Sequence, residues 1–377
     1  MKLTPLALSV FALTSVVNHA NAASYSIDAR GDGMGGVGVV GANYLTAPFY
    51  NPALAAVYRR NDDAGMLLPS IGLSYDDQDD LIGSLDGVTD LISSGASSSA
   101  AYHSALDELD GKALKANIGT AVAVGIPNRY MSMSIYGKLY SDTYVAPDIP
   151  TEADYPDAAA RASNSTIDAV TVAVLEGGVS IAKYYNLFGQ HVTLGITPKL
   201  QRINTYFYTE TLDNYDIFSV LDNSTSETSF NIDAGALWFY GPIRVGLSAM
   251  NIISRDITTL NVGGKQYNYS IGPVYTLGVG LVGDYAQVSV DYDLNVQKGY
   301  DEFDDDTQML RVGGEIDLMR QLKLRGGYKK NLKNEDDEGT YTAGIGLSPL
   351  GLFEMDVAVS YTNENSMGGY INFLSTY

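Results

Sequence analysis

The stretch Tyr285-Ala-Gln-Val-Ser-Val-Asp-Tyr-Asp-Leu-Asn-Val-Gln297 alternates apolar and polar side chains with a period of two. Its apolar residues fall at every second position from Ala286 to Leu294, and its polar residues fall between them, from Gln287 to Asp293. This period is typical of a β-strand with one apolar and one polar face. Such a strand fits a membrane barrel, whose apolar face meets lipid, or a soluble sandwich, whose apolar face meets a core.

The same alternation recurs after residue 65 and is equally clear over Phe353–Tyr361. It predicts fourteen strands in all. The predicted strands are Met66–Tyr75, Leu114–Ile126, Arg129–Ser141, Val170–Tyr184, Gln190–Tyr206, Ser229–Tyr240, Pro242–Ile253, Ile271–Val282, Tyr285–Gln297, Met309–Leu318, Gln321–Lys330, Thr340–Leu347, Leu352–Thr362 and Gly368–Tyr377.

The connections between these strands separate the two alternatives. A long link such as Asp76–Ala113 follows each odd strand, whereas a short turn such as Pro127-Asn128 or Gly283-Asp284 follows each even one. Outer-membrane barrels have this arrangement, with tight periplasmic turns and longer outer loops. We therefore predict an all-β fold, a transmembrane antiparallel β-barrel of about 14 strands over residues 66–377, with both chain ends on the periplasmic side.

Residues 1–22 have the features of a secretory signal peptide. A positive start at Met1-Lys2 precedes the apolar run Leu6–Val17, and Ala20-Asn21-Ala22 is a small-x-small cleavage site. We expect the mature chain to begin at Ala23 and to reside in the bacterial outer membrane. The sequence contains no Cys, which removes disulfides, thiolate metal ligands and a Cys nucleophile.

Residues 23–65 are too few for a domain and are predicted to form an N-terminal plug, or hatch, inside the lumen. A barrel of about 8 strands is filled by its own side chains, whereas one of about 16 leaves a channel, so this barrel encloses space that must be filled. The alternative is a disordered tail below the barrel. The apolar residues Val37, Val39 and Leu54 weigh against that alternative, because disordered tails are usually polar.

Two parts of this segment have distinct expected roles. The glycines let backbone pack closely against backbone and reach positive φ. Pro52 biases Asn51 away from the helical region and can start a short helix over Ala53–Tyr58, while the Asn51 amide can satisfy lumen-facing backbone groups. The residues predicted to pack or gate the plug are Gly33, Gly35, Gly36, Gly38, Phe49, Asn51 and Pro52.

No arrangement of residues predicts catalysis or a cofactor. The run Gly31–Gly36 matches the dinucleotide-binding fingerprint by letter, but that motif needs a preceding strand and a following helix, and neither is expected here. Once the signal peptide is removed, the histidines are His103 and His191, too few for a metal site or a triad. The protein is therefore predicted not to be an enzyme.

The formal net charge of −21 argues against nucleic acid as a partner, because phosphate binding needs Lys and Arg. The acidic runs Asp76–Asp80, Asp301–Asp306 and Asn334–Glu338 all fall in predicted outer loops. Such carboxylates are usually solvated, and the spacing of a calcium loop is missing, so no resident metal is predicted. Cation binding by one loop is an alternative, and its candidate residues are Asp301, Asp304, Asp305 and Asp306.

The stretch Gly33-Met-Gly-Gly-Val-Gly-Val39, followed by Phe49-Tyr-Asn-Pro-Ala53, resembles the N-terminal plug of long-chain fatty-acid outer-membrane transporters. Over almost the whole mature chain, the sequence resembles the family of conjugal-transfer TraF-type outer-membrane proteins. The stretches that carry this second resemblance are Ala47–Leu54, Gly177–Lys183, Leu194–Arg202, Arg244–Leu247, Arg311–Glu315 and Thr342–Pro349.

The first resemblance implies a small hydrophobic ligand, and the second implies conjugation machinery as a partner. Together with the predicted barrel, they favour a plugged channel through which a small hydrophobic compound passes, in contact with outer-membrane lipid. Two alternatives stay open. One is an accessory or structural component of a plasmid conjugation apparatus, and the other is a surface protein that acts through its acidic loops.

Overall fold

The structure is a computed structural model, and it describes residues 27–58, 64–77, 79–93, 100–212, 224–303, 305–334, 337–349 and 353–376. The predicted signal peptide, residues 1–22, lies outside the described residues, as do Asp304 and Tyr377. No helix within the described ranges is long and apolar enough to cross a membrane.

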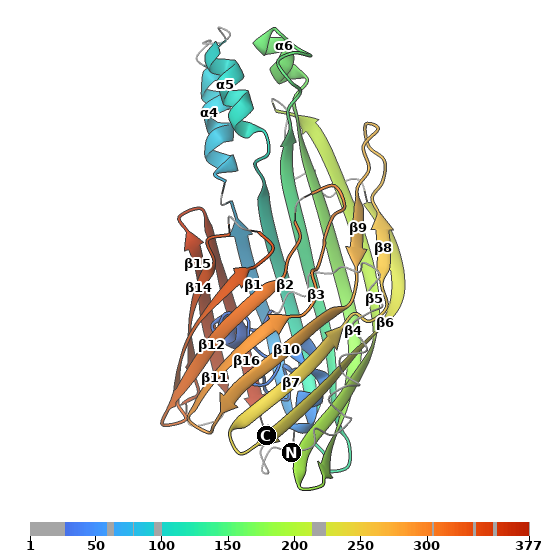
Figure 1. The fold of residues 1–377 in the computed structure, drawn as a ribbon, viewed down its shortest axis with the longest axis vertical. Coiled ribbons are helices and arrows are strands. Elements are labelled where there is room, and N and C mark those ends of the chain that lie inside the picture. The colour runs from blue at the N-terminus through green and yellow to red at the C-terminus, as the bar shows by residue number, and fades with distance from the viewer. Residues whose placement is uncertain are drawn as a thin grey trace, which may run out of the picture.

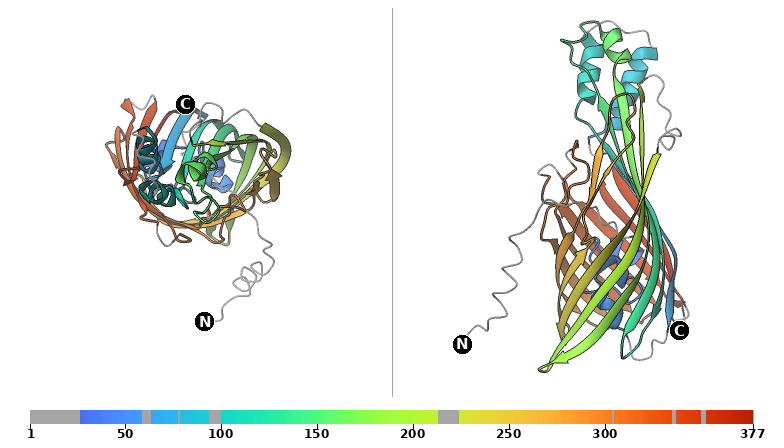
Figure 2. Two further views of the ribbon diagram at one scale, coloured as in Figure 1. Left: turned by 90° about the horizontal axis from the view of Figure 1, so that it is seen from above. Right: turned by 90° about the vertical axis from the view of Figure 1, so that its right-hand side faces the viewer.

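Fourteen antiparallel strands form a closed barrel in which β1 pairs with both β2 and β16 (Figures 1 and 2). This confirms the predicted fold class. The strands are β1 (Gly65–Asp76), β2 (Leu114–Ile126), β3 (Ser132–Asp148), β4 (Thr166–Leu187), β5 (Gln190–Thr211), β6 (Ser224–Tyr240), β7 (Ile243–Met250), β10 (Val274–Val282), β11 (Ala286–Asp293), β12 (Met309–Leu318), β13 (Leu322–Asn331), β14 (Thr340–Leu347), β15 (Glu354–Asn363) and β16 (Ser366–Thr376).

The alternation along the sequence becomes the two faces of the wall. On β11, Val288 and Val290 are exposed on the outside, whereas Asp291 and Asp293 are buried on the inside. Side chains of successive strand residues point to opposite faces, so a polar inner row and an apolar outer row follow directly from the sequence. An apolar outer surface of this kind is what a barrel in contact with lipid requires.

The barrel wall is taller on one side than on the other. Strands β4 and β5 each have 22 residues, whereas β7 and β11 each have 8. The sequence predicted β4 to begin at Val170, but it begins at Thr166 because Thr166 still pairs with Thr211 on β5. Here the inner face is apolar, and Val170, Val172 and Val174 are buried in a cluster with Tyr269 and Tyr300 from the outer loops.

One predicted loop contains a hairpin. Within the expected link Ser254–Ser270, the structure has the paired strands β8 (Arg255–Thr258) and β9 (Asn268–Ile271). The predicted strand Ile271–Val282 is consequently wrong at its start, because Ile271 belongs to β9 and the barrel strand β10 begins at Val274. Pro273 lies between them and has no backbone N–H to donate to a neighbouring strand.

Helices stand above the outer end of the barrel, which is the end that carries the long connections (Figure 1). They are α4 (Leu81–Ser93), α5 (Ala100–Leu109) and α6 (Ala158–Ser163). Leu81, Leu106 and Leu109 are fully buried between them. Arg161 adds a charged link, with its Nη2 2.6 Å from Asp107 Oδ1.

The N-terminal segment lies inside the barrel, where both views of Figure 2 show it in blue. It contains α2 (Ala29–Asp32), α3 (Ala47–Tyr50) and the 3-10 helix η1 (Pro52–Ala56). The predicted helix Ala53–Tyr58 therefore begins one residue earlier and ends at Ala56. Asn51 caps it, since Asn51 Oδ1 accepts a hydrogen bond from Ala53 N at 3.0 Å. We call residues 27–58 the insert.

Candidate functional site

Glycines on the inner face of the wall make room for the backbone of the insert. A Cβ atom added to Gly313 would lie 1.9 Å from Met34 O, and one added to Gly327 would lie 2.2 Å from Met34 C. On the opposite side of the barrel, a Cβ added to Gly195 would lie 2.4 Å from Pro52 C. At these three glycines the backbone of the insert therefore lies directly against the wall, with no space for a side chain between the two backbones.

The predicted plug glycines lie on the side of the barrel formed by β11 to β15. Gly35 and Gly36 have φ values of 71° and 81°, a backbone conformation that residues with a Cβ rarely adopt. The N–H of Gly35 donates to Thr342 Oγ1 at 2.7 Å. Gly33 packs on Gly344, where an added Cβ would lie 3.1 Å from the Cα of Gly344. A bulkier side chain at these positions would separate the insert from the wall.

Phe49, Asn51 and Pro52 lie on the opposite side, against β3 to β6. The Phe49 ring meets the Tyr136 ring edge-on, with centroids 5.5 Å apart. Asn51 Nδ2 donates to Val39 O at 2.9 Å and to Ala236 O of β6 at 3.2 Å. The amide thus links the two parts of the insert to each other and to the wall. The structure brings the predicted residues together within one insert but divides them between its two sides.

Asp291 holds the insert in place, a role that the sequence analysis did not identify. Its Oδ2 accepts hydrogen bonds from Gly38 N at 2.7 Å and Val39 N at 3.0 Å. The alternation on β11 indicates that this carboxylate points inward, but its partners lie more than 250 residues away in the chain. The only signal in the sequence was a charged residue on an inner face.

A second unpredicted feature is a charged network between the insert and β12, β13 and β15. Arg30 donates to Glu315 through Nε and Nη2, both at 3.0 Å. Arg325 donates to the same Glu315 at 2.6 Å and to Asp356 at 2.5 Å. Two-point arginine–carboxylate pairs fix geometry as well as charge. The network therefore holds α2 in a defined position inside the barrel.

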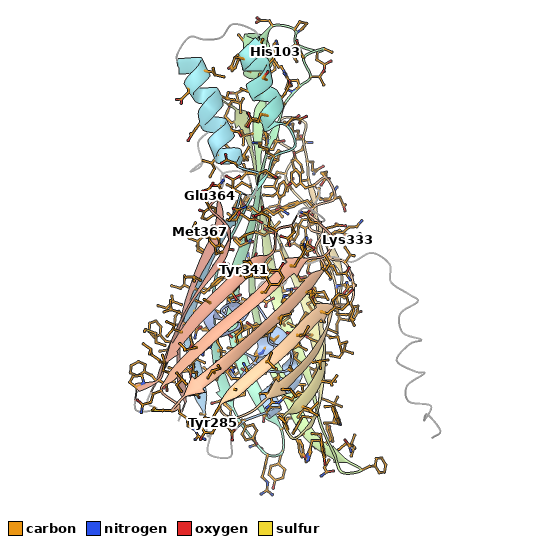
Figure 3. All side chains as sticks on the ribbon, turned by 60° about the vertical axis from the view of Figure 1, so that its left-hand side comes forward. His103, Tyr285, Lys333, Tyr341, Glu364 and Met367 are labelled. Atoms are coloured by element: carbon orange, nitrogen blue, oxygen red, sulfur yellow. The ribbon has the colours of Figure 1, made fainter. Side chains whose placement is uncertain are left out.

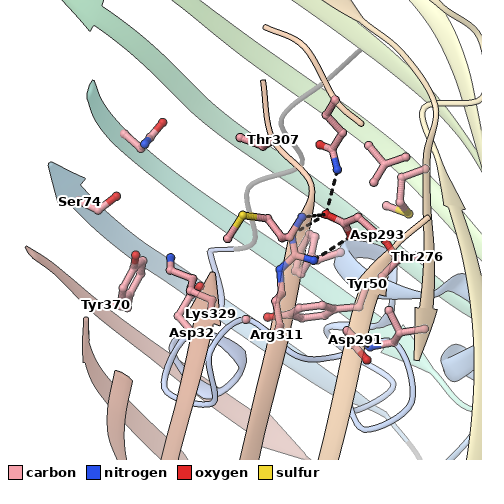
Figure 4. A pocket seen from close by; sticks show the side chains of 18 residues that line it. Asp32, Tyr50, Ser74, Thr276, Asp291, Asp293, Thr307, Arg311, Lys329 and Tyr370 are labelled. Atoms are coloured by element: carbon pink, nitrogen blue, oxygen red, sulfur yellow. Dashed lines mark hydrogen bonds and ion pairs between the residues drawn. The ribbon is translucent and has the colours of Figure 1, made fainter. Parts of the chain in front are cut away.

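Two cavities lie on opposite sides of the insert. The outer cavity has a volume of about 210 Å³ and is lined by Asp32, Val39 and Phe49 of the insert together with wall residues such as Arg311 and Lys329 (Figure 4). The inner cavity has a volume of about 420 Å³ and is lined by other insert residues, Arg30 and residues 41–45, and by the short turn at Gly283-Asp284. The insert thus forms the boundary between the two cavities.

Aromatic side chains from the loops cover the outer end above the tall wall. Tyr144 of β3 stacks on Phe303 with ring centroids 4.1 Å apart, and Phe303 also stacks on Tyr267. Lys265 Nζ lies 2.8 Å from Asp168 Oδ2 at the edge of this group. Burial lowers the pKa of the Lys265 ammonium, but hydrogen bonds to Asp148 and Asp168 outweigh it, so the net shift is upward. These contacts tie the hairpin and its neighbouring loop to the wall.

In the acidic loop around Asp301–Asp306, which the sequence analysis gave as an alternative cation site, Asp305 is held by hydrogen bonds from the backbone. Asp305 accepts hydrogen bonds from the backbone N–H groups of Gly299 and Tyr300, and burial raises the pKa of its carboxyl. Asp301 is exposed. In the part of the chain that the structure describes, no group of three or more His, Asp or Glu side chains could hold a metal ion. Asp304 lies outside that part, and cation binding at Asp301, Asp304, Asp305 and Asp306 stays a prediction.

His103 and His191, the histidines that follow the predicted signal peptide, lie at opposite ends of the molecule. His103 is buried on α5 in the helical cap, which is formed by α4, α5 and α6; Figure 3 labels it, and its ring contacts Pro156 O at 3.3 Å. His191 is the second residue of β5, beside a short turn, and stacks on Phe239 with ring centroids 5.4 Å apart. Each histidine ring packs against neighbouring residues of its own region. Because the two lie at opposite ends of the molecule, they cannot form one catalytic or metal site together.

Solved structures with the same fold define the class of this barrel. The toluene transporter TbuX of Ralstonia pickettii is 12% identical, with a TM-score of 0.56 over 93% of this chain and 97% of that one. A FadL homologue of Pseudomonas aeruginosa is also 12% identical, with a TM-score of 0.53 over 95% and 99% of the two chains. CymD, a monoaromatic hydrocarbon channel, is 10% identical, with a TM-score of 0.54 over 93% and 98%. The fold is therefore that of FadL-type outer-membrane barrels.

The sequence itself gives the family. Residues 48–293, more than half of the chain, match the family described as "F plasmid transfer operon, TraF, protein". The chain belongs to this family, as the quoted stretches led us to expect. No curated protein sequence matches it.

Proposed function

We propose that the protein is a non-enzymatic outer-membrane channel for a small hydrophobic compound and that the insert is the plug that closes it. The observation that carries this proposal is the position of the insert, which lies across the lumen and separates the outer cavity from the inner cavity. A barrel of this strand number would otherwise enclose open space. Residues Gly33, Gly35, Gly36, Gly38, Phe49, Asn51 and Pro52 would set the fit of the plug.

The structural neighbours support the choice of cargo. One is described as a toluene transporter and another as a monoaromatic hydrocarbon channel. Their sequences are only 12% and 10% identical to this chain, so the similarity is one of fold. The cargo of this protein is therefore our inference from the fold. The exposed apolar outer face supports a location in lipid, and we infer that the mature chain begins near Ala23.

The test of closure is the conductance of planar bilayers that contain the full mature protein or a variant without residues 23–60. We expect a large and stable rise in conductance on deletion. Retention of the heat-dependent shift in gel mobility, which a closed barrel gives, shows that the deleted protein is still folded. A folded, inserted deletion variant that conducts no more than the full protein would contradict the plug.

The family description favours a second candidate, a component of a plasmid conjugation apparatus that does not transport. The helical cap and the acidic outer loops would then be its contact surface. Gene deletion distinguishes the two proposals: loss of plasmid transfer with unchanged uptake of small aromatic compounds favours the second candidate. Reduced uptake with normal plasmid transfer favours the channel.

A further inference from the structure

Strand β4 extends past its neighbour β3 at the end of the barrel that carries the short turns. The two strands pair only as far as Ser132 with Ala182, whereas β4 continues to Leu187 and stays paired with β5 up to that residue. Lys183–Leu187 therefore have a paired side toward β5 and an open side toward β3. In the described part of the chain, no backbone hydrogen bond or bridge joins this open side to another segment.

The step between β4 and β3 is larger than the steps at the other short-turn ends of the described strands. The next largest are of two residues: β12 extends past β11 by Asp317 and Leu318, and β16 extends past β15 by Ser375 and Thr376. Figures 1 and 2 show the hairpin of β4 and β5, in green, reaching the end of the molecule opposite the helical cap. An open strand edge of this kind can pair with a further strand.

The projecting part of the hairpin is exposed along its whole length. Residues 183–190 are all exposed, and Phe188 at the tip is fully accessible to solvent. Phe188 and Gly189 form the two-residue turn with φ values of 54° and 78°, and a positive φ is strained for a bulky residue. Tyr184 and Tyr185 are 41% and 37% exposed. Aromatic side chains are enriched where proteins bind one another, so the hairpin has the composition of a contact surface.

The open side presents backbone donors and acceptors from alternate residues. The pair that closes the two-residue turn, Leu187 with Gln190, is of the type that exchanges both of its backbone hydrogen bonds. Alternation along the ladder then directs the N–H and C=O groups of Tyr184 and Asn186 away from β5, toward the open side. An extended peptide that pairs with these groups would add a strand to the sheet.

The charge around the open edge differs from that of the rest of the chain. The hairpin residues 182–191 and the turn between β2 and β3, residues 127–131, contain the cations Lys183 and Arg129 but no Asp or Glu. Both cations lie near the start of the edge, because they are close in the chain to the paired residues Ser132 and Ala182. The whole chain carries 44 acidic against 23 basic residues. A partner with complementary charge at this edge is therefore acidic.

We propose that the open edge of β4 binds an extended acidic segment of a partner protein, which adds to the sheet as a further strand at the periplasmic end of the barrel. The backbone of this segment pairs with Tyr184 and Asn186. Lys183, Tyr185 and Leu187 share one face of the strand, so they meet a carboxylate and two apolar side chains at alternate positions of the segment. The interaction does not require transport and thus goes beyond the channel proposal. Lipid is a poorer occupant, because hydrocarbon offers no partner to open backbone groups.

The test uses a fluorescent heptapeptide with valine at alternate positions and glutamate between them. Binding to the full mature protein is measured by anisotropy, in detergent and in nanodiscs that contain phosphatidylglycerol. Two matched peptides are the controls: one has lysine in place of glutamate, and the other has N-methylated backbone amides that cannot donate hydrogen bonds. We expect the glutamate peptide to bind about tenfold more tightly than either control, because only this peptide has both the charge and the backbone donors.

Three variants locate the binding. Asn186→Pro removes the N–H that faces the open side and keeps the pairing with β5, since proline is tolerated on strand edges. It should weaken binding of the glutamate peptide about tenfold. Asn186→Ala is the matched control, because both substitutions remove the hydrogen bond from Gly189 N to Asn186 Oδ1 but alanine keeps its backbone N–H. Lys183→Glu should weaken the glutamate peptide and strengthen the lysine peptide, a gain that a misfolded hairpin cannot give.

The possible outcomes distinguish the occupants of the edge. Equal binding of the three peptides, or equal binding to the proline and alanine variants, would overturn the proposal, and so would binding of no peptide in either medium. Binding in detergent that is lost in nanodiscs would mean that lipid covers the edge. Self-association of the protein that Asn186→Pro abolishes would assign the edge to a second copy of this chain. None of these results alters the conductance test, so the channel proposal stands or fails separately.

Discussion

The two parts of the insert are held in different ways. The glycine-rich part, residues 28–41, is fixed to β11–β15 mainly by polar contacts at individual residues, including Arg30 with Glu315 and Asp291 with Gly38, while its end at Val39 and Val40 joins the apolar cluster of the second part. The apolar part, residues 44–56, is buried against β1–β7 and β16 through side chains such as Leu54, which is 0% exposed. The strength of the polar contacts depends on the geometry and charge of a few individual residues. The stabilisation from apolar packing is instead spread over many residues. We infer that the glycine-rich part opens first and that the apolar part is the anchor.

Amide hydrogen exchange of the purified barrel measures the two parts separately. Each variant below is expected to change the exchange rates of one part more than those of the other. A tenfold change in rate corresponds to about 1.4 kcal/mol of opening free energy when exchange follows the open population.

The largest expected effect comes from Leu54→Ala, which would break the anchor. Removal of a fully buried leucine costs about 2–5 kcal/mol because it leaves a cavity. We expect faster exchange in both parts of the insert, since the glycine-rich part loses the support of its neighbour. Leu200→Ala is the control, because Leu200 is 61% exposed on the outer face. Acceleration limited to residues 28–41 would show that Leu54 does not belong to the anchor.

Arg30→Gln should loosen the glycine-rich part while leaving the apolar part closed. A hydrogen bond to a charged group contributes about 1.5–3 kcal/mol, and Glu315 would still have Arg325 as a partner. The expected result is exchange about 10–100-fold faster in residues 28–41, with the conductance rising.

The control for this prediction is Lys112→Gln, which removes a cation far from the insert whose partner, Glu108, has a side chain that is 67% exposed. Exposed ion pairs contribute about 0–1 kcal/mol, so the insert should not respond. Equal acceleration of residues 44–56 by Arg30→Gln would mean that the two parts open together.

Gly327→Ala tests the close backbone contact on the same side. The added methyl group would lie 2.2 Å from Met34 C and 2.3 Å from Gly35 N, so the insert must shift. Excess volume in a packed core costs about 1–3 kcal/mol. The neighbouring substitution Gly326→Ala is a matched control, because its Cβ would come no closer than 3.9 Å to Thr342 O. The comparison fails if both alanines have the same effect on residues 28–41.

The sequence predicts much of the wall and little of the polar contacts inside it. The alternation at Gln287–Asp293 identifies inner and outer faces because the side-chain period of a strand is two. It cannot identify which inner carboxylate meets Gly38 or Arg30, since these pairs depend on where the insert lies within the closed barrel. The prediction also fails at Val170, where the inner face is apolar because the outer loops cover it.

Within the insert, too, the sequence predicts local structure but not the contacts between segments that are far apart in the chain. Asn51 and Pro52 predict a turn followed by a helix because of local backbone preferences, and the structure has η1 at this place. Local preferences do not predict that Gly195 of β5 lies against Pro52, because that contact joins segments far apart in the chain. The sequence predicts the environment of Leu54 better than that of Arg30. The burial of Leu54 is expected because its side chain is apolar, whereas nothing in the sequence identifies the carboxylate that pairs with Arg30.

The smallest expected effect comes from Thr342→Val, which removes one neutral hydrogen bond and keeps the shape of the side chain. Thr342 Oγ1 accepts from Gly35 N at 2.7 Å, and valine would leave that N–H without its acceptor inside the barrel. The cost is about 1 kcal/mol or somewhat more, so exchange at Gly35 and its neighbours should rise several-fold while residues 44–56 are unchanged. Thr342→Ser, which keeps the hydroxyl, should restore the wild-type rate. If valine and serine accelerate exchange equally, the hydroxyl does not hold Gly35, and the difference between the two parts of the insert rests on Arg30 and Asp291 alone.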